Sequence, residues 1–508
     1  MALATIKTIA LMGLSGHLIN VEVDISDGIP SYTLLGLPDA ALSESKDRVR
    51  SAIVNSGEPW PNRRATVSLS PAWLPKSGSG FDLPIAIGLL KANGLLEMAG
   101  ADDQVAIGEL GLDGQIRPVR GVLPALLAAR KSGVTRAIVP SGNRAEAALV
   151  SGLEVIAVNT LREVIAYFRC GEMPTVDQIP TVPIAPISEL DLTDVVGQHQ
   201  ARYAMEIAAI GGHHLLFIGP PGTGKTMLAE RIPTILPGLD QEAALDVTAL
   251  HSIAGKLLDR SVLSSTPPFV APHHTTSTPA MVGGGSHQIR PGACSLAHHG
   301  VLFIDEAPEC ASGVLDALRQ PLESGEVTIS RSHGSVTYPA QFILVLAANP
   351  CPCGRFSGRG RGCTCSAVQI RRYLRRLSGP LMDRIDIRTF VEPPSRAQLM
   401  SLEIGESSTL VRERVLVARG RSKERFALLP WKQNSQIPAK YLRSEFRAEK
   451  GGMALLHQEI EQERLSARGY HKILRLAWSV ADQRSHPVPT VADVESAMTL
   501  RQSLGIFS

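Results

Sequence analysis

A short motif in the middle of the chain constrains the fold more than any other feature. The apolar run 215–218 leads into Gly219-Pro-Pro-Gly-Thr-Gly-Lys-Thr226, and a helical pattern follows. A strand that turns through glycines into a helix surrounds bound phosphates with backbone N–H groups and a helix N-terminus. We expect Lys225 to reach the β and γ phosphates and the Thr226 hydroxyl to ligate Mg²⁺. The residues expected to hold ATP are Gly219, Pro220, Pro221, Gly222, Thr223, Gly224, Lys225 and Thr226.

Two further apolar runs end in polar residues that suit the same chemistry. Residues 301–304 precede Asp305 and Glu306, and residues 342–348 precede Asn349. We expect Asp305 to hold Mg²⁺, Glu306 to act as general base toward the attacking water, and Asn349 to orient that water. Taken alone, a helix-capping carboxylate or a turn-forming asparagine explains each run equally well. Their order after the phosphate loop favours the catalytic interpretation.

The length of the chain requires several domains. It has 508 residues, whereas a single hydrophobic core stops growing near about 250–300 residues. Strand and helix patterns alternate over 1–170 and again over 191–392, and helical patterns dominate 393–508. The segment 171–190 holds four prolines, which favour a semi-rigid linker. We therefore expect an α/β protein: an α+β domain, a linker, a parallel-sheet domain and a helical domain.

Charge and hydropathy limit where in the cell the protein can reside and which partners it can bind. No run reaches the roughly 18 apolar residues that span a bilayer, and the first residues resemble a strand more than a signal peptide. We expect a cytoplasmic protein without a membrane partner. The net charge of +3 is too small to attract nucleic acid over the whole surface, so such binding must come from local patches.

Four of the seven cysteines form two Cys-x-Cys pairs, which indicate a metal site in a chain without a secretion signal. Four thiolates at this spacing can close tetrahedrally around Zn²⁺, although idle cysteines remain the alternative. The expected ligands, within the insert 351–365, are Cys351, Cys353, Cys363 and Cys365. The other three, Cys170, Cys294 and Cys310, are expected to be buried thiols.

The same region is strongly basic. Residues 350–382 contain seven arginines and no acidic residue. Such a segment can contact nucleic-acid phosphates or a neighbouring subunit, and we favour the first. A predicted hairpin over 325–338 adds Arg331 and His333 near its tip. The candidate nucleic-acid contacts are Arg331, His333, Arg355, Arg359 and Arg361.

Four longer segments carry a family resemblance: GPPGTGKT, RPGACSLAHHGVLFIDEAPE, LAANPCPCG and SGPLMDRIDI. Over essentially its whole length the chain resembles the magnesium-chelatase-like AAA+ ATPases, and within them the YifB/ComM family. The resemblance implies a homohexameric ring with ATP and Mg²⁺ between subunits. It also implies a helicase that acts on single-stranded and branched DNA, driving branch migration of recombination intermediates during natural transformation.

The resemblance further assigns individual residues and segments. Arg384 would be an arginine finger that reaches the next subunit's ATP, and Arg468 would be a sensor arginine on a helical lid, 393–508. Surface salt bridges are the alternative for both arginines. The hairpin 325–338 would precede the strand of Asn349, and the insertion 271–290 would project into the ring. His273 and His274 in that insertion are more simply hydrogen-bonding groups than metal ligands.

The front of the chain resembles the proteolytic domain of Lon. Gly80 stands where Lon has its nucleophilic serine, and Leu123 stands where it has the base lysine. A serine nucleophile needs a neighbouring base, so we expect an inactive domain. Two other functions remain in competition with a DNA motor: a magnesium-chelatase-like subunit that remodels a protein partner, and a Lon-like ATP-dependent protease.

Overall fold

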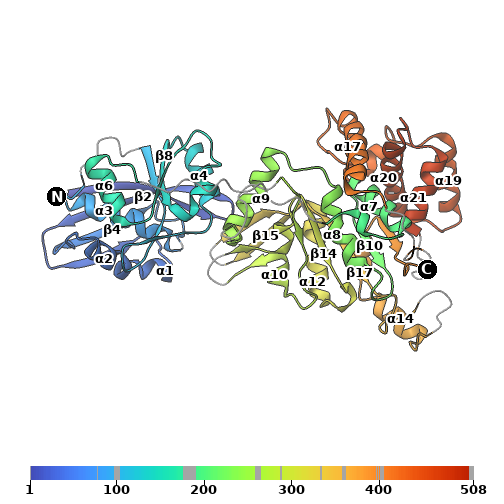
Figure 1. Ribbon diagram of the computed structural model, residues 1–508, viewed down its shortest axis with the longest axis horizontal. Helices are drawn as coiled ribbons and strands as arrows, with labels where there is room; N and C mark the ends of the chain where they lie inside the picture. Colours follow the sequence, from blue (N-terminus) through green and yellow to red (C-terminus); the bar gives the residue numbers. More distant parts are fainter. Residues whose placement is uncertain are drawn as a thin grey trace.

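The computed structural model describes residues 2–76, 78–96, 103–174, 190–257, 265–285, 289–331, 334–356, 362–395, 398, 400 and 405–502. Two α/β units follow each other along the long axis of the molecule, and a group of helices lies beyond the second (Figure 1). We call residues 2–174 the amino-terminal unit and residues 190–395 the central unit. Within the described residues, no helix combines the length and the apolarity that crossing a membrane requires.

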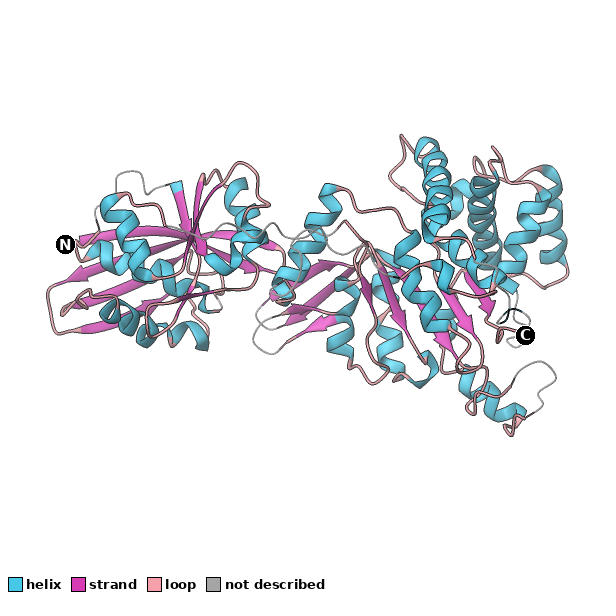
Figure 2. Cartoon of the chain, in the orientation of Figure 1, coloured by secondary structure: helices cyan, strands magenta, loops and turns pink. Residues whose placement is uncertain are grey.

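The amino-terminal unit is built on a seven-stranded mixed sheet with the order β3-β4-β2-β1-β5-β8-β9 (Figure 2). Alternate residues of β2 are buried, so one face of this sheet holds a core. Antiparallel β1 and β2 pair along their whole lengths and meet in a turn at Gly13. The strands are β1 (Ala2–Met12), β2 (Ser15–Ser26), β3 (Ser31–Leu35), β4 (Arg64–Ser70), β5 (Gln104–Ala106), β8 (Arg136–Pro140) and β9 (Glu154–Val158).

Helices and a small ribbon complete this unit. The central helices α3 and α4 pack on β1 and β2, and α3 is buried nearly all round because its sequence is almost wholly apolar. The elements are α1 (Ala40–Ser43), α2 (Ser45–Asn55), α3 (Asp82–Ala92), β6 (Glu109–Leu110), β7 (Ile116–Arg117), α4 (Val122–Lys131), α5 (Arg144–Ala147) and α6 (Leu161–Cys170).

The central unit contains the parallel sheet that the sequence predicts. Its order is β11-β14-β17-β10-β18, and all neighbours are parallel. Every residue of β10, β14 and β17 is buried, because both faces of the sheet are covered. The strands are β10 (Leu215–Ile218), β11 (Phe269–Val270), β14 (Val301–Ile304), β17 (Ile343–Ala348) and β18 (Ile387–Phe390).

One face of this sheet shares a core with the carboxy-terminal helices. Leu215 and Phe217 of β10 pack into it, whereas Leu216 and Ile218 face the other core. An apolar stripe of α20, which includes Ile473 and Leu476, is fully buried here. The helices around this core are α7 (His199–Gly211), α8 (Lys225–Ile235), α17 (Ser408–Arg425), α18 (Ala439–Leu442), α19 (Lys450–Glu461), α20 (Ala467–Arg484) and α21 (Val491–Gln502).

The other face carries shorter elements and the predicted hairpin. β15 and β16 pair antiparallel from Glu326 with Pro339 to Arg331 with Gly334, which confirms the hairpin. The elements are α9 (Gln241–Ala254), α10 (Thr278–Val282), β12 (Gly283–Gly284), β13 (Arg290–Pro291), α11 (Ala293–Leu296), α12 (Ser312–Ala317), α13 (Arg319–Ser324), β15 (Glu326–Arg331), β16 (Gly334–Pro339) and α15 (Gly379–Met382). A further helix, α14 (Ala367–Leu374), packs separately with the cysteines 351–365.

Candidate nucleotide site

The phosphate loop joins β10 to α8 at the carboxyl edge of the parallel sheet. Gly222 and Gly224 adopt φ values of +75° and +86°, which favour glycine and let the chain curl back on itself. The Lys225 ammonium donates to the carbonyls of Gly219 at 2.7 Å and Pro220 at 2.9 Å. Burial lowers the pKa of Lys225, while the charges of Asp305 and Glu306 act in the opposite direction. The Lys225 ammonium therefore lies against the loop backbone, where phosphate oxygens would replace the two carbonyls as its hydrogen-bond acceptors.

Side chains at the ends of β14 and β17 meet the loop. The Thr226 hydroxyl donates to Asp305 Oδ2 at 2.9 Å, and Lys225 Nζ donates to Asn349 Oδ1 at 3.2 Å. Because β10, β17 and β14 are parallel neighbours, their carboxyl ends share one edge of the sheet. Thr226 and Asp305 offer the oxygen ligands that Mg²⁺ prefers, so the residues present fit that ion.

Glu306 has a partner that the sequence did not indicate. Its backbone is left-handed, with φ +47°, and its N–H donates to Asp305 Oδ1 at 2.8 Å. Its carboxylate Oε2 lies 3.4 Å from Nδ1 of His274, in the turn that follows β11. β11 borders β14 in the sheet, and that adjacency brings the two side chains together. Sequence alone could not reveal the pairing, since it depends on the strand order.

Arg384 and Arg468 lie near each other, and each is paired with an acidic residue. Arg384 pairs with Glu323, and Arg468 donates to Asp383 at 2.7 Å. Burial lowers the pKa of Arg384, and the nearby charges of Arg319 and Arg468 add to the effect. Part of this positive cluster is therefore neutralised within the chain, as the salt-bridge alternative anticipates.

A buried ion pair fixes the segment beside this cluster. Asp386 contacts Lys472 of α20 at 2.7 Å and His213 at 3.2 Å. Burial alone would raise the pKa of Asp386, but the Lys472 ammonium and the His213 hydrogen bond outweigh it and hold that pKa well below its usual value. The helix that carries Arg468 is thus tied to the strand that follows Arg384. Nothing in the local sequence pattern points to this pair.

The four cysteines predicted to bind metal come together. Cys351 Sγ lies 3.3 Å from Cys353 Sγ and 3.7 Å from Cys363 Sγ, and all four sulfurs lie within 4.8 Å of one another. A Zn²⁺ tetrahedron with bonds of about 2.3 Å separates its sulfurs by about 3.8 Å. The residues therefore fit zinc.

The remaining cysteines divide into two kinds. Cys294 and Cys310 are buried as predicted, and burial raises the pKa of these thiols to about 12 and about 11. The prediction for Cys170 is wrong, because this residue ends α6 and is exposed. The two apolar residues before it, Tyr167 and Phe168, pack on the core instead.

A second cluster of possible ligands does not fit a metal. Atoms of Asp246, His298 and His299 lie within 4.8 Å of one another. However, His298 Nδ1 accepts the Gln341 N–H at 3.0 Å, and burial lowers the pKa of His298 to about 3. The neutral ring then carries its proton on Nε2, so neither nitrogen has a free lone pair for an ion.

The arginine-rich segment is largely on the surface. Arg355 is exposed, whereas Arg359 and Arg361 lie outside the described residues. Four further arginines on or just after α14 are also exposed: Arg371, Arg372, Arg375 and Arg376. One of them, Arg376, is engaged by Glu309 at 2.8 Å. The patch therefore offers several guanidiniums to an anionic partner.

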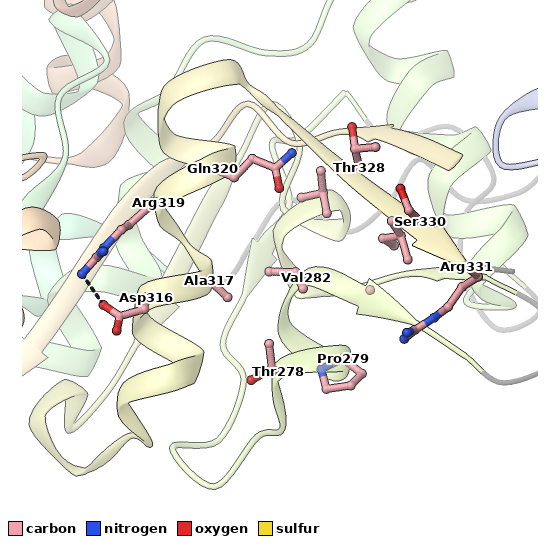
Figure 3. A pocket seen from close by; sticks show the side chains of 13 residues that line it. Thr278, Pro279, Val282, Asp316, Ala317, Arg319, Gln320, Thr328, Ser330 and Arg331 are labelled. Carbon is pink, nitrogen blue, oxygen red and sulfur yellow. Dashed lines mark hydrogen bonds and ion pairs between the residues drawn. The ribbon is translucent and has the colours of Figure 1, made fainter. Parts of the chain in front are cut away.

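The hairpin borders a pocket of about 490 Å³. α10, β12, α12, α13 and β15 line it, with Arg331 at one end and the Asp316–Arg319 pair at the other (Figure 3). Arg331 is exposed at the end of β15, and His333 lies outside the described residues. The pocket thus lies between the hairpin and residues of the insertion 271–290.

The amino-terminal unit lacks a serine–lysine pair at the positions that Lon uses. Leu123 is fully buried, and the Ser79 hydroxyl is bonded to the Glu109 carboxylate. The Lon mechanism needs a lysine as the base beside its serine, and the Glu109 carboxylate is not that lysine. Gly80 offers no nucleophile in this position either.

Comparisons with known proteins match each part of the chain to a family description. Three family descriptions match successive parts of the chain: "Subunit ChlI of Mg-chelatase" over residues 21–143, "Magnesium chelatase, subunit ChlI" over 191–399, and "Magnesium chelatase, subunit ChlI C-terminal" over 405–501. The middle match contains the phosphate loop, Asp305, Glu306 and Asn349.

Several relatives match nearly the whole chain. An uncharacterized protein of Mycobacterium tuberculosis is 46% identical over 503 residues, 99% of each chain. Competence protein ComM of Haemophilus influenzae is 42% identical, covering 95% of this chain and 94% of its own. The uncharacterized protein YifB of Escherichia coli is 40% identical, covering 99% and 97%. The chain therefore belongs to the YifB/ComM family of magnesium-chelatase-like AAA+ proteins.

Proposed function

We propose that this chain is an ATP-driven DNA motor that works as a ring of six copies and promotes branch migration of recombination intermediates. One observation carries the proposal: Lys225, Thr226, Asp305 and Asn349 are joined by hydrogen bonds of 2.9 and 3.2 Å at one edge of a parallel sheet. This constellation is suited to phosphoryl transfer, in which catalysis is mostly positioning and charge stabilisation.

Each side chain has a distinct role in hydrolysis. ATP supplies the γ-phosphoryl group, and Mg²⁺ supplies positive charge beside it. Lys225 and the loop N–H groups hold the phosphates, while Thr226 and Asp305 orient the ion. Glu306 takes a proton from the attacking water, and Asn349 positions that water. One of its carboxylate oxygens faces the His274 ring, so this pair competes with the attacking water for Glu306.

The ring completes the site with positive charge. Arg384 would stabilise the γ-phosphoryl charge in the neighbouring copy, and Arg468 would contact the nucleotide from the helical lid. A guanidinium suits this role because it stays charged and binds phosphate oxygens in a fork. Arg384 is paired with Glu323 and Arg468 with Asp383 inside the chain, so both ion pairs must open before either guanidinium can reach a phosphate.

DNA is proposed as the substrate on two grounds. Exposed arginines around the cysteine cluster form a basic surface without competing acids in that segment, and a Zn²⁺ ion held by the four cysteines would fix its shape. In addition, one relative that matches nearly the whole chain bears the name competence protein, in keeping with the role in natural transformation that the family resemblance implies.

ATP turnover with and without DNA tests the proposal. We expect single-stranded or branched DNA to raise the turnover of the wild-type chain, Lys225→Ala to abolish it, and Glu306→Gln to bind ATP without hydrolysing it. A control such as His17→Ala, in β2 of the amino-terminal unit, should behave as wild type. Wild-type turnover that is unaffected by any DNA would refute the motor function.

A further inference from the structure

The amino-terminal unit touches the hairpin at the turn between β1 and β2. Gly13 in this turn has φ +62°, and a Cβ on it would lie only 2.4 Å from Cγ1 of Val336 in β16. The methyl carbon of Met12 lies 3.5 Å from the place where a Cβ on Gly334 would stand. Leu14 packs against the cores of both units. The turn therefore fits closely against the hairpin, and glycine permits the approach.

A second contact anchors the same unit to helix α9. Ser252 near the end of α9 accepts the Gly121 N–H at 3.1 Å and donates to the Glu146 carboxylate at 2.6 Å. Glu146 is buried and is held in place by Asn143 at 2.7 Å. Ala249 of α9 is buried in a core of the amino-terminal unit. This contact is polar, buried and fully bonded, so it is a specific one.

The two contacts join parts of the central unit that have different roles. α9 follows the phosphate-loop helix in the chain, whereas the hairpin leads directly into β17, which ends beside Asn349. The hairpin also meets the insertion, because the Tyr338 hydroxyl donates to the Ile289 carbonyl at 2.8 Å. The amino-terminal unit thus braces the hairpin against α9.

We propose that the amino-terminal unit is a brace that fixes the hairpin β15–β16 through the turn at Gly13 and the Ser252–Glu146 contact. Its role in the motor is to set how strongly DNA at the hairpin changes ATP turnover. This second part rests on the proposed function. The side chains of the turn act as positioning residues, since none of them approaches the phosphate loop through a described contact.

Hydrogen exchange at the hairpin tests the brace without DNA. Gly13→Ala places a methyl group against Val336, so exchange of the backbone amides of 334–338 should become roughly 5- to 100-fold faster. Gly133→Ala is the matched control: Gly133 also has a positive φ, of +82°, but a Cβ there meets nothing within 4 Å. Equal exchange in the two variants would overturn the proposal.

A rescue variant separates the contact from general damage. Val336→Ala removes the atom that a Cβ at position 13 would meet, so the double variant Gly13→Ala/Val336→Ala should return to the exchange rates of Val336→Ala alone. Ser252→Val should loosen the hairpin independently, since it breaks the other contact. Additive effects of Gly13→Ala and Val336→Ala, with no rescue, would count against the brace.

ATP turnover then tests the role of the brace in coupling. Gly13→Ala should keep the DNA-free kcat and the KM for ATP within about twofold of wild type, but lose most of the stimulation by single-stranded DNA. Undiminished stimulation with a loosened hairpin would overturn the coupling role. If the wild type is not stimulated at all, the motor function fails, whereas the exchange experiment still decides whether the brace exists.

Discussion

Removing the carboxylate of Asp386 should destabilise the central unit more than the substitution of any exposed side chain. Asp386 and Lys472 are both nearly inaccessible, and their charged atoms are 2.7 Å apart. Asp386→Ala leaves a buried ammonium without its counter-charge, which typically costs about 3–5 kcal/mol. We expect the lower value, about 3 kcal/mol, because Lys472 keeps a hydrogen bond to the Ile385 carbonyl at 3.2 Å.

This loss should appear as a fall in the melting temperature of about 6–12 °C, at about 2–4 °C per kcal/mol for a unit of this size. Fluorescence of Trp478, buried in the same helix α20, reports the transition. Replacing both partners, as in Asp386→Leu/Lys472→Met, should restore more than half of the loss because no unpaired charge remains. A fall in the melting temperature of less than about 2 °C in Asp386→Ala, or a double variant less stable than the single one, would show that the buried ion pair does not stabilise the central unit as expected.

The pH dependence of the stability of the same variant tests the ion pair a second time. The pKa of Asp386 is lowered in the folded chain, so its contribution is fully present above the ordinary carboxyl pKa of about 4. As pH falls below that value toward the folded pKa, the carboxylate gains a proton and the contribution is lost. The difference in unfolding free energy between wild type and Asp386→Ala should therefore stay near about 3 kcal/mol between about pH 5 and about pH 7. It should become smaller below about pH 4.

Three further predictions concern the site. Cys351→Ser should remove about one equivalent of zinc per chain in metal analysis of the purified protein; a wild-type protein free of metal and equally stable would contradict the zinc site. His274→Ala should raise DNA-free ATP turnover because it releases Glu306. The increase should be at most about fivefold, since an exposed ion pair contributes little free energy. Unchanged or lower turnover would show that the pair does not restrain Glu306. Arg384→Ala should inactivate its neighbour, so mixing it with Lys225→Ala should restore some turnover, whereas no restoration at any ratio would place Arg384 in the site of its own chain.

The parts of the molecule that sequence predicts well are those with local signals. The strand, loop and helix around Lys225, the hairpin of Arg331 and the helices after residue 393 each follow from residues close together in the chain. The spacing of Cys351, Cys353, Cys363 and Cys365 likewise brings the four thiols together, because a short loop joins the two pairs.

The parts that sequence did not predict depend on contacts between distant segments. His274 reaches Glu306 only because β11 borders β14, and Lys472 reaches Asp386 across 86 positions, a separation that no periodic pattern encodes. The fit of Gly13 against Val336 requires two separately folded units to meet. Cys170 illustrates the opposite error: a thiol is often buried, but this one follows the last packed residues of its helix.

Dissociation of a labelled four-way DNA junction distinguishes an ATP-driven motor from a protein that only binds DNA. We expect the wild-type chain to separate the junction into two duplexes only with ATP and Mg²⁺, and Lys225→Ala to leave it intact at equal protein concentration. A junction that stays intact with active wild-type protein, or that dissociates equally with Lys225→Ala, would contradict an ATP-driven DNA motor.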